Sequence, residues 1–139
     1  EALAAATDAY AKYLEVSDAI FQAGASQTDS LDLVMTGAYL ESSLEAFRLA
    51  AGKGLKSTGT TKFDQVKLQQ YNEVSNGEAV IVAYVCEDIT DVDVVDANGN
   101  SLVSPDRPDR TLFEVTFDFD KTTQSLLISQ RTPWSEEAC

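Results

Sequence analysis

The sequence predicts an α+β domain in which N-terminal helices pack on a curved antiparallel sheet of four to five strands. Up to about residue 51, apolar residues recur every three to four positions, which is the period of an amphipathic helix. Beyond Lys56 the pattern changes to short apolar runs separated by turn residues, which indicates strands joined by hairpins. Helices that precede such strands cover one face of the sheet, so residues 1–139 are expected to form a single domain.

Two helical segments are predicted. The first carries its apolar stripe from Ala6 to Ala23, and Gly24 fits a C-terminal stop. The second runs from about Leu31 to Ala51. Gly37 inside the second stripe predicts a break into a short helix and a longer one, or a close contact.

The strands are predicted from four kinds of pattern. Ser75-Asn76-Gly77-Glu78 indicates a hairpin turn, because Asn-Gly tolerates positive φ. The run 79–86 is expected to be buried on both faces, and the alternating run 111–120 on one face only. Turn-rich residues 57–61 precede the first strand, and Pro133 and Trp134 are expected to lead out of the last one. The remaining predicted strands are 63–71, 91–95 and 125–132.

The chain is acidic, with a net charge of −13 and 44 % hydrophobic residues. Residues 1–72 hold nine acids and six bases (−3), whereas residues 73–139 hold fourteen acids and four bases (−10). This charge would repel phosphate groups, which argues against nucleic acid and against an anionic membrane surface as partners. The simplest interpretation is that the negative charge keeps the protein soluble.

Histidine is absent, which removes the commonest general base and metal ligand. Ser-His-Asp and Cys-His pairs therefore cannot form within these residues. The glycines near residues 52–59 follow a helix instead of opening one, so they do not form a phosphate-binding loop. We accordingly expect no cofactor and assign no catalytic residue.

A cluster of acids after residue 86 raises the question of a calcium site. Its members are Glu87, Asp88, Asp91, Asp93 and Asp96. In the segment that starts at Asp96, Ser101 replaces the glycine of a calcium loop and Arg107 replaces its bidentate glutamate. A solvated strand edge and turn explain these acids better, so no metal is predicted.

Cys86 and Cys139 are the two cysteines, too few for a zinc site of the usual type. The residues alone leave a disulfide and two free thiols open. A bridge would tie down the C-terminal residue and stabilise the fold by roughly 4 kcal/mol in the chain-entropy model.

The helix–helix–strand order resembles the nuclear-transport-factor-2-like fold, also called the cystatin-like cone. The sequence is similar in particular to secreted proteins and lipoproteins of actinobacteria with this fold, over residues 9–139. The features that carry the resemblance are Tyr10 and Tyr13, Thr36-Gly37, Val85-Cys86-Glu87-Asp88 and Cys139. The resemblance implies helices in the concave face of a bent sheet.

The same resemblance implies export through a signal peptide to an extracellular or cell-envelope location. It implies membrane attachment only through a lipid anchor outside these 139 residues. It also implies a Cys86–Cys139 disulfide, which suits an oxidising compartment.

The leading functional hypothesis is a non-catalytic cell-envelope module that binds a small apolar ligand or a partner protein. The resemblance places Tyr13, Tyr39, Tyr84 and Phe117 at the mouth of a ligand pocket in the cone. The competing interpretation of the tyrosines is plain core packing. A further hypothesis is a homodimer that hides the open face of the sheet around Leu112.

The alternative is an isomerase or hydrolase of the ketosteroid-isomerase type. Such an enzyme would need an Asp or Glu inside the cone, within hydrogen-bond reach of a tyrosine. The sequence itself does not identify such a pair.

Overall fold

The computed structural model describes residues 1–73, 79–135 and 139 and confirms the α+β prediction. Its helices are α1 (Ala2–Gln22), the short 3-10 helix η1 (Asp29–Leu33) and α2 (Gly37–Gly52). The strands are β1 (Lys56–Thr58), β2 (Lys62–Glu73), β3 (Ala79–Asp88), β4 (Asp93–Val95), β5 (Arg110–Asp120) and β6 (Ser125–Ser135). The predicted turn at 75–78 lies outside the described residues.

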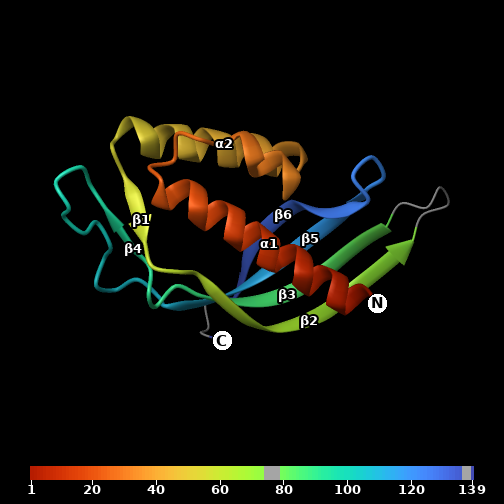
Figure 1. The fold of residues 1–139 in the computed structure, drawn as a ribbon. Helices are drawn as coiled ribbons and strands as arrows, with labels where there is room; N and C mark the ends of the chain where they lie inside the picture. The colour runs from red at the N-terminus through yellow and green to blue at the C-terminus, as the bar shows by residue number, and fades with distance from the viewer. Residues whose placement is uncertain (74–78, 136–138) are drawn as a thin grey trace.

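The main sheet has four antiparallel strands in the order β2-β3-β5-β6. The sheet is strongly bent, and α1 crosses its concave side while α2 lies beside α1 (Figure 1). Alternate residues of β3 and β5 point toward α1, so that Ile81, Val85 and Phe117 form the core with Tyr10. No helix of the described residues is both long enough and apolar enough to span a bilayer.

The second helical segment is divided as predicted. η1 ends at Leu33, α2 begins at Gly37, and Gly37 has a φ of 64°. The residues between the two helices run beside β6, where the Thr36 N–H donates to the Ile128 carbonyl at 2.9 Å. The Ile128 N–H in turn donates to the Val34 carbonyl at 3.0 Å, so this connection covers part of an edge of the main sheet.

The short strand predicted at 91–95 is present, but it does not join the main sheet, so the expected single sheet is corrected. It forms β4, which pairs with β1 in a separate two-stranded sheet. β1 lies in the segment that the turn residues had marked as irregular, and three residues are too few to show a period. Gly59 follows it with a φ of 83°, and a Cβ there would lie 1.9 Å from the Asp91 carbonyl oxygen, so the two segments approach closely.

Two further expectations about the strands are corrected. β6 continues through Pro133 and Trp134 to Ser135. Proline is tolerated there because β6 is an edge strand. β3 was expected to be buried on both faces, but Val80, Val82 and Tyr84 on its convex side are partly exposed. Its fully buried residues lie mainly on the concave side.

Candidate functional site

A polar network is buried where β3 ends beneath α1. The Tyr10 hydroxyl donates to Oε1 of Glu87 at 2.8 Å, and the Arg131 guanidinium donates to Oε2. Nε of Arg131 also donates to the Tyr10 hydroxyl oxygen at 3.0 Å. Both carboxylate oxygens of Glu87 therefore have partners within the protein.

Aromatic rings surround this ion pair. The guanidinium carbon of Arg131 lies 3.7 Å from the centre of the Phe113 ring and 5.7 Å from that of Tyr13. The side chain of Arg131 is only 18 % exposed, and Glu87 as a whole residue is 7 % exposed. Charges this deeply buried persist because each satisfies the other, and the rings add cation–π attraction.

Burial also acts on the tyrosines of the network. It raises the pKa of Tyr10, and the negative charge of Glu87 adds to the rise while Arg131 opposes it. Burial raises the pKa of Tyr13 in the same way, and the Tyr13 hydroxyl lies 2.9 Å from the Tyr39 hydroxyl. Both side chains thus stay neutral in the folded protein at pH values where an unfolded chain would ionise them.

This burial predicts a loss of stability at alkaline pH. Stability from a raised tyrosine pKa is complete below about pH 10 and falls above it by about 1.4 kcal/mol per pH unit per tyrosine. In urea titrations between about pH 9 and pH 11, where the unfolded tyrosine is on average half ionised, we expect Tyr13→Phe to make the fall less steep by about half of that amount. Tyr71→Phe, at an exposed tyrosine, is the control and should keep the wild-type slope. Equal slopes for Tyr13→Phe and wild type would mean that Tyr13 ionises in the native state.

The four residues predicted to line one pocket are divided between the two faces of the sheet. Tyr13 and Tyr39 meet on the concave side, and Phe117 is fully buried in the core there. Tyr84 lies on the opposite face, where its ring centre is 5.1 Å from that of Trp134. Because β3 alternates its side chains between the faces, Tyr84 cannot share a cavity with the other three.

The acidic cluster is also dispersed. Each carboxylate has its own partner, and the described residues contain no group of three or more acids, cysteines or histidines that could hold a metal ion. Glu87 pairs with Arg131, Asp88 with Thr90 and Arg110, and Asp91 with Lys62. Asp93 accepts a hydrogen bond from the Ser101 hydroxyl, and Asp96 accepts hydrogen bonds from the backbone N–H groups of Asn98 and Asn100.

The disulfide is confirmed. Cys86 and Cys139 are bonded across a sequence separation of 53 residues, with their Cα atoms 5.9 Å apart. Cys86 belongs to the same side of β3 as Tyr84, so the bond joins the last residue to the convex face. The Cys139 carbonyl also accepts a hydrogen bond from the Gln65 side chain at 3.3 Å.

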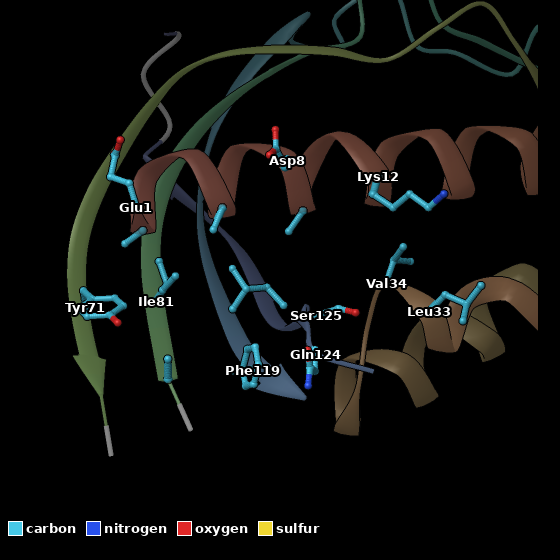
Figure 2. Close-up of a pocket in the computed structure, with 15 residues that line it drawn as sticks. Glu1, Asp8, Lys12, Leu33, Val34, Tyr71, Ile81, Phe119, Gln124 and Ser125 are labelled. Carbon is cyan, nitrogen blue, oxygen red and sulfur yellow. The ribbon is translucent and has the colours of Figure 1, made fainter. Parts of the chain in front are cut away.

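A cavity of about 710 Å³ opens at the other end of the sheet (Figure 2). The N-terminal half of α1 forms one wall, the facing ends of the four main strands form another, and η1 closes one side. Ala5, Ala9, Ile81, Phe119 and Leu126 are among the side chains that line it. Sequence reasoning missed this cavity, although Ala2, Ala5 and Ala9 mark a helix face too small to fill the space above the sheet.

The cavity and the buried ion pair are separate. Glu87, Tyr10 and Arg131 are absent from the cavity lining. Ile81 in the cavity and Glu87 are six residues apart on β3, which corresponds to about 20 Å along a strand. The buried Glu87–Tyr10 pair therefore does not face the ligand-sized space.

Two solved structures with TM-scores above 0.5 support the fold. No family model and no curated protein sequence matches the chain. The intermembrane space region of chloroplast protein ARC6 has a TM-score of 0.68 at 14 % identity, over 96 % of this chain and 97 % of that chain. A periplasmic fragment of TraM gives 0.57 at 17 % identity, over 90 % and 93 %. Aln2 from a Streptomyces species gives 0.46 at 22 % identity, over 93 % and 86 %.

Proposed function

We propose that this chain is an exported, non-catalytic cell-envelope module that binds a small apolar ligand between α1 and the open end of the sheet. The cavity carries this proposal. Its volume of about 710 Å³ falls within the range of ligand sites, and its lining is mostly apolar with a few polar groups.

The disulfide supports the export part of the proposal. Disulfides persist in oxidising compartments and are rare in the cytosol. The ARC6 region belongs to an intermembrane space, and the TraM fragment is periplasmic. This is compatible with the same kind of location here, while attachment by a lipid anchor and an actinobacterial source stay predictions from the sequence resemblance.

The buried pair favours a binding role over the isomerase or hydrolase alternative. Glu87 and Tyr10 are within hydrogen-bond distance, as that alternative requires. However, Tyr10 is 0 % and Glu87 7 % exposed, and Arg131 occupies the second carboxylate oxygen. A general base must reach the proton that it removes, and neither Glu87 nor Tyr10 lines the cavity. We therefore assign this pair a structural role.

Filling the cavity tests the proposal. Ala5 is exposed and lines the cavity, so Ala5→Trp places a large ring inside it without disturbing the core. We expect Ala5→Trp to weaken binding of the uncharged fluorescent probe Nile red by roughly tenfold or more, because the cavity wall that the probe contacts is occupied.

The matched control is Ala4→Trp, at an exposed position of the same helix that is absent from the cavity lining. It should bind the probe as the wild type does. Circular dichroism of both variants should show an unchanged fold. Equal binding by Ala5→Trp and wild type, or no binding by the wild type, would contradict the proposed ligand site.

A further inference from the structure

The charged side chains around the cavity lie at its rim and are directed away from its centre. Figure 2 shows Asp8 on the side of α1 opposite the cavity and Glu1 at the N-terminal end of α1, with both side chains directed away from the cavity. The Lys12 side chain runs along the helix, away from the middle of the cavity. All three residues are exposed, so their charges remain in water.

Uncharged polar groups lie on the wall opposite α1. Gln124 and Ser125 are found there, where the chain enters β6 (Figure 2). The Ser125 hydroxyl donates to Thr123, at 3.2 Å to its carbonyl, which leaves the serine oxygen able to accept a hydrogen bond. The Gln124 side chain makes no hydrogen bond with the described residues, so its amide is available to a ligand as well.

Large apolar side chains are exposed at the mouth of the cavity. Leu33 is 56 % exposed and Tyr71 is 47 % exposed, and both line the opening. Exposed apolar surface next to a cavity is typical of ligand sites. A ligand whose apolar part reaches from the mouth of the cavity to the wall at Gln124 would cover this exposed apolar surface.

From these placements we infer that the ligand is an uncharged lipophile whose polar end is a hydroxyl or carbonyl group held by Ser125 and Gln124. The inference rests on the proposed function and specifies its ligand. A charged head group inside the cavity would lose its water, and none of the described charged residues in the lining is directed toward the cavity centre to compensate it. An anionic one would also approach a protein whose net charge is −13.

Three competitors with the same alkyl chain test the inference: 1-decanol, decanoate and decylammonium, each displacing Nile red near neutral pH. We expect decanol to displace the probe at a concentration roughly tenfold or more below that of either ion, because only the ions must bury a charge. Lys12→Gln should leave the decanoate result unchanged. If decanoate or decylammonium competes as well as decanol, the inference is overturned while the proposed function stands. If Nile red itself does not bind, both fail.

Ser125→Ala tests the position of the polar end. It should weaken decanol binding by roughly three- to tenfold, the usual effect of one lost hydrogen bond, and leave Nile red binding nearly unchanged. Ser129→Ala is the matched control, because the Ser129 hydroxyl donates to Thr116 and is absent from the cavity lining. If Ser125→Ala binds decanol as tightly as Ser129→Ala does, the polar end does not contact Ser125 and this assignment is overturned.

Discussion

Arg131→Met is expected to lower the free energy of unfolding by about 3–5 kcal/mol, which is a large part of the stability of a domain this size. The reason lies in the partner that remains. Glu87 is 7 % exposed, and without Arg131 it would be a buried carboxylate with one hydrogen bond, from Tyr10. Urea denaturation near neutral pH measures the loss.

Two variants separate the buried charge from the loss of the arginine side chain. Glu87→Gln with Arg131→Met removes both charges and keeps an acceptor for the Tyr10 hydroxyl, so the double variant should recover much of the stability. Arg48→Met breaks the exposed pair with Glu45 on α2 and should leave the denaturation midpoint unchanged. A single Arg131→Met variant as stable as Arg48→Met would show that the buried pair does not hold this end of the core together.

The inward position of Arg131 depends on a register shift that the sequence does not reveal. Strict alternation along β6 from the buried Ile128 would place Gln130 inside and Arg131 outside. In the structure Ile128 pairs with Phe117 and Gln130 with Thr116, so Ser129 is an extra residue between them. This β-bulge turns Arg131 to the concave face opposite Val115. Hence the pair was missed, and the expectation that Glu87 is solvated is wrong, because Glu87 lies on the core side of β3 with Val85.

The parts of the fold that the sequence predicted are those with a long local pattern. The helices α1 and α2 and the strand β5 each repeat their period over more than ten residues, and the structure has all three. β1 has three residues and no period, so only its partner β4 could bring it into a sheet. The cavity depends on the distance between α1 and the bent sheet, which small residues permit but do not specify. The sequence therefore predicted which helix or strand carries a given residue, but it did not predict the sites that form between helices and strands.

The second large effect is expected from the disulfide. Cys139→Ala should lower the free energy of unfolding by about 4 kcal/mol, because the unfolded chain gains the entropy that a closed loop of this length removes. The bond spans 53 residues, from β3 to the last residue, and so encloses β4, β5 and β6. Changing Cys139 and not Cys86 keeps the fully buried Cys86 side chain on β3 and avoids leaving a gap at that position. Guanidinium denaturation of the variant and of the oxidised wild type measures the difference.

Reductant provides the control for this prediction and connects it to export. Dithiothreitol should lower the stability of the wild type to that of Cys139→Ala and should leave the variant unchanged, since the variant has no bond to reduce. If the wild type kept its full stability in reductant while its thiols reacted with a thiol reagent, the fold would not depend on the bond. An oxidising compartment would then offer this chain no stability that the cytosol lacks, and the structural argument for export would be lost. A loss near the expected size would mean that the four-stranded sheet reaches its full stability only where the bond can form.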